Sequence, residues 1–236
     1  MILTIITVVR NGALTVERCL DSISGLIESG KVEHLIVDGG STDNTLDICK
    51  RYSCRVVHQR GRGIYSAMNQ GLDAATGRYS MFVNSDDAIS LEAAQVSLNI
   101  LEAKGDRPVH LFGVNIRDNH RILNVWNPAK TIERKFAMPA PHPGAIVKTL
   151  IAKNELRFDE SLRFSADYHM MLRLQQLKGI DCHEFPIVDF YVGGASARFP
   201  AMLENLRIRK KLQLPKWTRI AGFFYDMIRY IRSKFL

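Results

Sequence analysis

The chain has 236 residues, of which 46% are hydrophobic and 24% charged, and therefore fits a globular domain with an appendage. It lacks both an apolar run of about 18 residues and a basic leader, which argues against a spanning helix or a signal peptide. Its four cysteines show no Cys-x-x-Cys spacing, which favours reduced thiols in a cytoplasmic protein. Its net charge of +8 comes from residues 207–236, which hold nine basic residues and one acid, while the neutral remainder excludes a nucleic-acid-binding body.

Apolar runs alternate with helical patterns through the first half of the chain. Strands are predicted at Leu3–Val9, His34–Asp38, Cys54–His58, Tyr79–Asn84 and His110–Asn115. Helices are predicted between them at 16–27, from Ser41 onward, at Ile64–Ala75 and at Ser90–Lys104. Short connections between such elements predict an α/β fold with a mainly parallel sheet covered by helices on both faces.

The regular alternation ends after about residue 116. Residues 139–144 read Pro-Ala-Pro-His-Pro-Gly and predict a stiff loop, because each proline fixes its own φ and biases its predecessor to extended geometry. A helix is expected from Ala166 to Lys178, ended by Gly179, and a strand from Ile187 to Val192.

Two adjacent carboxylates, Asp86 and Asp87, follow the apolar run 79–83. We expect them at the carboxyl edge of the sheet, where open α/β folds bind ligands. Adjacent carboxylates are costly to hold together without positive charge beside them, and a divalent metal that carries a diphosphate would supply it. An ordinary turn that caps the next helix explains the same residues without a ligand.

A second polar segment, Asp38–Thr45, leaves a strand, turns on two glycines and enters a helix. Glycines let the backbone approach a ligand, and the Asp38 carboxylate can accept a hydrogen bond from a base or ribose. A capped turn accounts for Ser41 and Asp43 without any ligand, but it explains Asp38 less well.

These segments resemble family 2 glycosyltransferases in residue type, order and separation. The resemblance rests on Ile5–Asn11, Asp38–Thr45, Gly63–Gly71 and Asn84–Asp87, and it continues through His142-Pro143, Phe158-Asp159, Ala166–Tyr168 and Gly193–Ser196. Within that family the chain looks like the bacterial exopolysaccharide branch, including the colanic-acid type. The resemblance implies a GT-A fold, a nucleotide-diphosphate sugar donor, Mn²⁺ or Mg²⁺ as cofactor, inversion at the anomeric carbon and a lipid-linked saccharide acceptor.

The resemblance also implies roles for single residues. Asp87 would bind the metal and Asp167 would be the general base. The nucleotide sugar would contact six residues: Thr7, Asn11, Asp38, Arg62, Asn69 and Asp86. His142 would contact the acceptor or the diphosphate or complete the metal shell, or it would be structural. The other histidines, including His34, His58, His110 and His183, are interpreted as ordinary strand or surface residues.

Three positions depart from the family pattern. Gly39 stands where a second acid is common, and Gly61 and Ser66 stand where this branch usually has aspartates. A nucleotide-sugar-binding protein without turnover is therefore the alternative. For Asp167, in the first turn of its helix, the alternative role is helix stabilisation alone.

The chain is expected to divide into three parts. Residues 1–115 would bind the nucleotide sugar, residues 116–206 would bind the acceptor within the same catalytic domain, and residues 207–236 would form a basic amphipathic tail. From Lys216 to Leu236 a helix is predicted whose apolar stripe is bordered by basic residues, which suits an interfacial helix on the inner, anionic face of the cell membrane. Packing of that stripe on the catalytic domain or on another subunit is the alternative.

If the tail binds the membrane, deletion of residues 207–236 should release the protein from anionic liposomes and preserve transfer to a soluble acceptor.

Overall fold

The structure is a computed structural model that describes residues 1–103, 107–192 and 199–232. Its first elements follow the prediction: β1 (Leu3–Val9), α1 (Val16–Ile27), β2 (Val32–Asp38), α2 (Thr45–Cys49), β3 (Arg55–His58), α3 (Ile64–Ala74), β4 (Tyr79–Phe82) and α4 (Leu91–Ala103). Lys104, the predicted end of the last helix, and the Gly193–Ser196 motif lie outside the described residues.

The later elements are β6 (Val109–Arg117), β7 (Ile122–Trp126), β8 (Ala145–Lys148), α5 (Thr149–Glu155), α6 (Ala166–Leu174), β9 (Ile180–Tyr191), α7 (Phe199–Lys211) and α8 (Lys216–Arg232), with β5 (Ala88–Ile89) between β4 and α4. Two short 3₁₀ turns are η1 (Pro128–Lys130), before the proline-rich loop, and η2 (His142–Gly144), which forms the last three residues of that loop. The sequence did not predict β5, β7, β8, α5 or α7. Strand β7 is mostly exposed and therefore has no apolar run to mark it.

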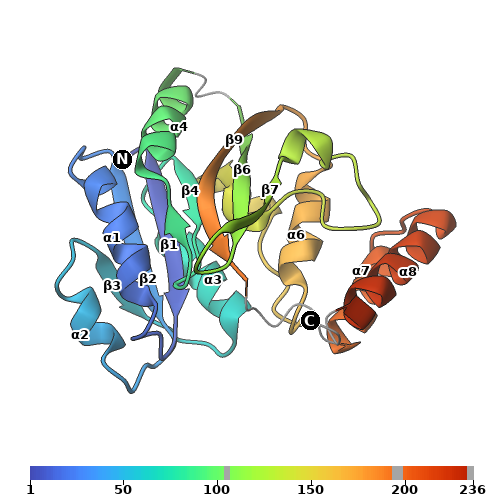
Figure 1. Ribbon diagram of the computed structural model, residues 1–236, viewed down its shortest axis with the longest axis horizontal. Coiled ribbons are helices and arrows are strands. Elements are labelled where there is room, and N and C mark those ends of the chain that lie inside the picture. The colour runs from blue at the N-terminus through green and yellow to red at the C-terminus, as the bar shows by residue number, and fades with distance from the viewer. Residues whose placement is uncertain (104–106, 193–198, 233–236) are drawn as a thin grey trace.

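The described strands form one nine-stranded sheet in the order β3-β2-β1-β4-β8-β6-β9-β5, with β7 paired to β6 (Figure 1). Strands β3, β2, β1 and β4 are parallel, as predicted. Strand β8 runs antiparallel to both β4 and β6, whereas β9 returns parallel to β6. The parallel arrangement therefore holds for the first half of the chain, and the second half adds a mixed extension to the same sheet.

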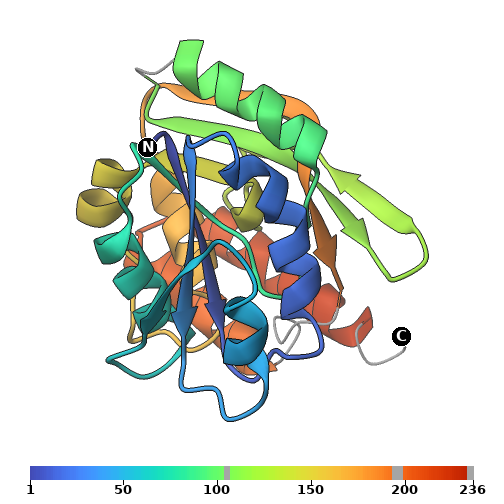
Figure 2. The ribbon, with the colours of Figure 1, turned by 90° about the vertical axis from the view of Figure 1, so that its left-hand side faces the viewer.

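Helices cover both faces of this sheet, as the sequence predicted (Figure 2). One core lies between the strands and helices α1 and α4, with Ile23 and Leu98 fully or almost fully buried in it. The other lies beneath α3, α5 and α6, and includes Leu72, Ala152 and Met171. Because the apolar faces of the helices meet apolar strands on both sides, the carboxyl ends of the strands are held as a rigid edge.

Helices α7 and α8 form a hairpin at the end of the molecule opposite α1 and α2 (Figure 1). A buried arginine, Arg209, fixes this hairpin to the body. Its guanidinium donates to Asp226 at 2.7 Å, to the Tyr168 hydroxyl at 2.9 Å and to the Phe136 carbonyl at 2.8 Å. A Cβ atom on Gly222 would lie 2.4 Å from the Arg209 Cζ, so glycine is required for this close approach.

The inward face of α8 is polar and its outward face is apolar. Thr218, Gly222 and Asp226 are buried against the body. Five large apolar side chains are exposed: Trp217, Ile220, Phe224, Ile228 and Ile231. The predicted alternative that this stripe packs on the catalytic domain is therefore wrong for these residues, although Phe223 and Met227 are partly buried. In the described part of the chain no helix is long and apolar enough to cross a membrane.

Two predicted boundaries fall inside regular elements. Residue 115 lies within β6, and residue 206 lies within α7. The parts predicted to bind the nucleotide sugar and the acceptor thus share one sheet, and the basic residues that begin the predicted tail share a helix with the residues before them.

Candidate active site

The loops that follow β1, β2, β3 and β4 meet at one edge of the sheet. Register places Val9 beside Asp38, and Asp38 beside His58, so these three strands end together. The turns after β1 and β2 are joined, because the Asn11 side chain accepts from the Thr42 amide at 2.8 Å and the Asn11 amide donates to the Ser41 hydroxyl at 2.9 Å. The result is a continuous polar rim at the carboxyl edge, the position at which such sheets bind ligands.

The diacid lies on this rim, as expected, but Asp87 is buried there. It is 0% exposed, and its two carboxylate oxygens accept from the Tyr191 amide at 2.9 Å and from the Asn84 side chain at 2.7 Å. Burial raises the pKa of Asp87 from 3.8 to about 7, with the neighbouring Asp86 adding to the increase.

Two residues that the sequence did not single out enclose the diacid. Arg18 of α1 donates to the Asp86 carbonyl, and its guanidinium lies 3.6 Å from the centre of the Tyr191 ring. Tyr191 in turn ends β9 and holds Asp87. Both partners are far away in sequence, by 68 and 104 residues, so no local motif could have indicated them.

The residues present fit a divalent cation. Asp86 and Asp87 supply hard oxygen ligands, which Mg²⁺ and Mn²⁺ prefer. The raised pKa of Asp87 indicates a buried charge that the protein alone does not compensate, and a cation would compensate it. Because Asp87 is 0% exposed, a cation would reach its carboxylate only after the residues around it move.

Three of the residues predicted to contact the nucleotide are buried and hydrogen-bonded within the protein. Asp38 is 1% exposed and accepts from the amides of Gly40 and Ser41 at 3.1 Å, so it shapes the turn after β2. Thr7 is fully buried, with its hydroxyl 3.1 Å from His34. These two contacts with the nucleotide are therefore not supported.

Asn69 is the third. It is buried, and its amide donates to the Phe158 carbonyl and accepts from the Phe158 amide, both at 2.9 Å. A further bond of 2.8 Å joins it to Glu160. Asn69 therefore ties α3 to the segment before α6, and its polar groups are occupied by protein.

Asn11, Arg62 and Asp86 remain available to a ligand. Asn11 and Arg62 are exposed, and Asp86 is partly exposed. The structure also explains one departure from the family pattern, because a Cβ on Gly39 would lie 3.2 Å from both the Arg10 Cβ and the Gln59 side chain. A second acid at this position would have to displace its neighbours.

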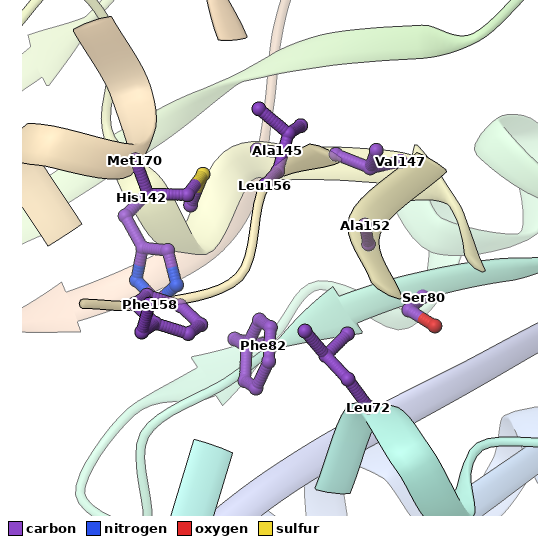
Figure 3. A pocket seen from close by; sticks show the side chains of 10 residues that line it. All are labelled: Leu72, Ser80, Phe82, His142, Ala145, Val147, Ala152, Leu156, Phe158 and Met170. Carbon is purple, nitrogen blue, oxygen red and sulfur yellow. The ribbon is translucent and has the colours of Figure 1, made fainter. Parts of the chain in front are cut away.

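His142 lies in an apolar environment that favours the structural alternative. It lines a cavity of about 20 Å³, with its ring 5.4 Å from that of Phe82 and 5.6 Å from that of Phe158 (Figure 3). Burial lowers the pKa of His142 to about 4, so the imidazole is neutral at physiological pH. A metal or acceptor contact for His142 is not supported by this packing.

Asp167 lies in the first turn of α6 and lines a second cavity, of about 40 Å³. Burial raises the pKa of Asp167 from 3.8 to about 6, while Arg229 and two backbone amides act to lower it. The start of α6 also lies near Tyr65 of α3: burial raises the pKa of the Tyr65 phenol, the Asp167 carboxylate adds to the increase, and the backbone of Ala166 and Asp167 acts to lower it. Tyr65 follows Arg62 by three residues, so the base candidate and the amino-terminal end of α3 are neighbours.

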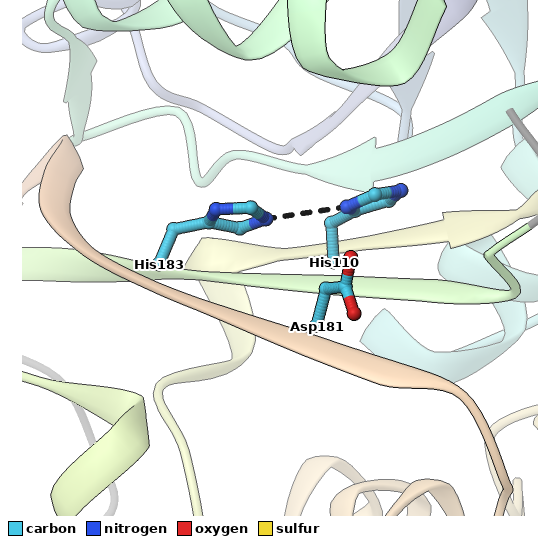
Figure 4. Close-up of side chains that lie close together, drawn as sticks. All are labelled: His110, Asp181 and His183. Atoms are coloured by element: carbon cyan, nitrogen blue, oxygen red, sulfur yellow. Dashed lines mark hydrogen bonds between the residues drawn. The ribbon is translucent and has the colours of Figure 1, made fainter. Parts of the chain in front are cut away.

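A separate cluster joins His110, Asp181 and His183, whose ligand-type atoms lie within 4.8 Å of one another (Figure 4). These atoms suit zinc, and the two rings are also hydrogen-bonded at 3.2 Å. The sequence analysis interpreted both histidines as ordinary residues. Asp181 and Tyr191 are separated by roughly 30 Å of extended strand, so this cluster is distinct from the diacid.

The family model for glycosyl transferase family 2 matches residues 4–148, which is more than half of the chain and includes the diacid. The chain belongs to glycosyl transferase family 2. Curated relatives agree: a glycosyltransferase of PGL/p-HBAD biosynthesis from Mycobacterium tuberculosis is 39% identical over 92 residues, covering 36% of each chain. The uncharacterized glycosyltransferase EpsJ of Bacillus subtilis is 28% identical over 193 residues, covering 70% of this chain and 54% of that protein. The chain thus matches only about a third to a half of these relatives.

Solved structures show the same fold. S. aureus TarS (residues 1–349) superposes with a TM-score of 0.73 at 18% identity, covering 99% of this chain and 73% of that one. The mannosyltransferase PcManGT from Pyrobaculum calidifontis, in complex with GDP-Man and Mn²⁺, gives a TM-score of 0.66 at 17% identity, covering 98% and 73%. This family 2 chain therefore has the GT-A fold.

Proposed function

We propose that this enzyme is an inverting, metal-dependent glycosyltransferase that moves a sugar from a nucleotide-diphosphate donor to a hydroxyl of a lipid-linked saccharide in bacterial surface polysaccharide biosynthesis. The observation that carries the proposal is the pair of carboxylate sites: Asp86 and Asp87 on the rim of the sheet, and Asp167 at the start of α6 beside α3. A single displacement needs one site for the departing diphosphate and one for the attacking hydroxyl.

In this proposal Asp167 takes the proton of the acceptor hydroxyl as that oxygen attacks the anomeric carbon. A pKa of about 6 leaves the carboxylate mostly ionised at neutral pH, yet basic enough to accept a proton. A divalent cation held by Asp87, with Asp86 beside it, would stabilise charge on the departing diphosphate. Arg62 is exposed before α3 and would add positive charge on the same side.

The ligands of the structural relatives suggest which donors to test. TarS has been crystallised with UDP-GlcNAc, and PcManGT with GDP-Man and Mn²⁺. We therefore propose a donor screen with UDP and GDP sugars, a polyprenyl-diphosphate-linked sugar acceptor, and Mn²⁺ or Mg²⁺. Acceptor-dependent release of nucleoside diphosphate from one donor supports the proposal. Saturable donor binding without product on any acceptor supports the binding protein without turnover instead.

The outward face of α8 supports a peripheral position on the inner face of the cell membrane. Trp217, Phe224 and Ile228 are 65%, 57% and 53% exposed on one stripe, while basic residues account for the net charge of this region. Apolar side chains beside basic ones suit the interface of an anionic leaflet, where each basic residue contributes about 1 kcal/mol. A lipid-linked acceptor would lie in the same plane.

Deletion of residues 207–236 does not test membrane binding alone, because it also removes the buried ion pair between Arg209 and Asp226. Replacing Ile220, Phe224 and Ile228 by serine leaves that pair intact. We expect this triple variant to lose at least about tenfold in affinity for phosphatidylglycerol vesicles, because burial of each side chain is worth about 1.5–3 kcal/mol. Co-sedimentation at low salt measures the effect.

A matched control replaces Ile122, Leu123 and Val125, which are similarly exposed on β7, by serine. This control should bind vesicles like wild type. Equal binding by the α8 variant and wild type contradicts the membrane role. A wild-type dimer in solution that the α8 variant converts to a monomer assigns the stripe to a second subunit instead.

A further inference from the structure

Helix α8 has a second functional surface on its inward side. The positions 218, 222, 226 and 229 follow one another at helical spacing and face the same way. Three of them are buried against the body, and the fourth, Arg229, is exposed at the edge of that face. Asp226 and Arg229 line the cavity that also contains Asp167. The helix that carries the outward apolar stripe therefore also forms a wall of the cavity that contains the proposed base.

The hairpin fixes the position of the helix that carries Asp167. Glu204 of α7 accepts hydrogen bonds from the amides of Arg163, Phe164 and Ser165 at 2.8–3.1 Å, directly before α6 begins. Arg209 holds the next residue, Tyr168, through its hydroxyl. The residues on both sides of Asp167 in sequence are thus held by contacts from α7, while the Asp167 carboxylate itself accepts from the Tyr168 amide at 2.8 Å.

Charged and titratable groups face Asp167 from every element packed around it. They are Tyr65 from α3, Tyr168 from α6 itself, Glu204 and Arg209 from α7, and Asp226 and Arg229 from α8. Arg209 and Asp226 pair with each other at 2.7 Å and so largely offset one another. Of the remaining ionised groups, Glu204 opposes the negative charge on Asp167 and Arg229 favours it.

We propose that Arg229 is a positioning residue for Asp167: from the inward face of α8 it stabilises the ionised carboxylate, which makes the hairpin part of the acceptor site. The inference rests on the proposed role of Asp167 as general base. The region after residue 206 would then have two roles. The outward face of α8 would bind lipid, and its inward face would keep the carboxylate of Asp167 ionised. Removal of the hairpin would then lower turnover even on a soluble acceptor.

The test is a ¹³C NMR titration of protein labelled with ¹³C-aspartate, in which Asp167→Asn identifies the Asp167 carboxyl signal. Loss of the positive charge in Arg229→Gln should raise the titration midpoint of Asp167 by about half a pH unit or more. Arg229→Lys should restore the wild-type midpoint. Arg207→Gln is the matched control, because Arg207 is exposed on α7 and its loss changes the net charge equally without touching the cavity.

A midpoint in Arg229→Gln that stays within about 0.2 pH units of wild type overturns the inference, as does an equal shift in Arg207→Gln. The same variants are then assayed for turnover with the donor found in the screen. The acidic limb of the pH profile should move upward with the NMR midpoint in Arg229→Gln alone. An NMR shift combined with full turnover by Asp167→Asn overturns the base assignment, and with it the proposed function of the site, while leaving the Arg229–Asp167 coupling intact.

Discussion

Asp87→Asn should abolish metal-dependent transfer, lowering turnover by about 10³-fold or more, because the cation that stabilises the departing diphosphate would lose its charged ligand. Asparagine keeps the shape of the side chain and can still accept from the Tyr191 amide, and rotation of the Asn84 amide by 180° lets its oxygen accept from the new side-chain nitrogen, so the fold should be retained. Asp87→Ala should lose activity equally but leave Asn84 and the Tyr191 amide without their acceptor. Turnover is measured against Mn²⁺ concentration for each variant.

The same substitution should stabilise the metal-free protein at alkaline pH. Folding raises the pKa of Asp87 from 3.8 to about 7, so the folded state binds a proton more tightly than the unfolded state. The wild type therefore loses stability as pH rises between these values, and the neutral asparagine does not. Above pH 7 we expect the metal-free Asp87→Asn variant to gain about 1–4 kcal/mol in free energy of unfolding. Urea unfolding at pH 5 and pH 8 without metal measures this difference.

Two controls test whether these effects are specific to the Asp87 carboxylate. Mn²⁺ should raise the unfolding midpoint of the wild type but not that of Asp87→Asn, since only the wild type retains the charged site. Asp47→Asn, an exposed change of equal charge on α2, should behave like wild type in every assay. Wild-type turnover and metal dependence in Asp87→Asn are incompatible with a metal site at the diacid.

Asp167→Asn should lower turnover by about 100-fold or more while leaving donor and metal binding unchanged, because it removes a general base and no ligand of the donor. Two other carboxylates, Asp159 and Glu160 in the segment before α6, are engaged elsewhere. Asp159 pairs with Lys211 at 2.7 Å, which helps to lower the pKa of Asp159 to about 2, and Glu160 accepts from Asn69. A carboxylate with so low a pKa would be a weak base.

The pH profile provides a second measurement for Asp167. Turnover by the wild type should fall below about pH 6, as protonation removes the base, and the residual activity of Asp167→Asn should lack that limb. Asp159→Asn is the control, and its profile should keep the limb near pH 6. Near-normal turnover with weakened donor binding in Asp167→Asn would instead place this residue in the donor site.

Local features of the chain were predictable from the sequence alone. Strands β1, β2 and β4 are buried and their sequences are largely apolar, and the helices between the first strands have amphipathic spacing or capping residues. The diacid and Asp167 were found because their motifs are contiguous in sequence. Each of these signals depends on residues a few positions apart, so one chain is enough to detect it.

Only the tertiary structure decided what these residues contact. Asp87 is buried by Tyr191, 104 residues away, and Asn69 is occupied by Phe158, 89 residues away. Helical periodicity located the apolar stripe of α8 but did not show which side faces the body. The ion pair between Arg209 and Asp226 and the contact at Gly222 turn the polar side inward, because a buried guanidinium needs partners that three separate segments bring together.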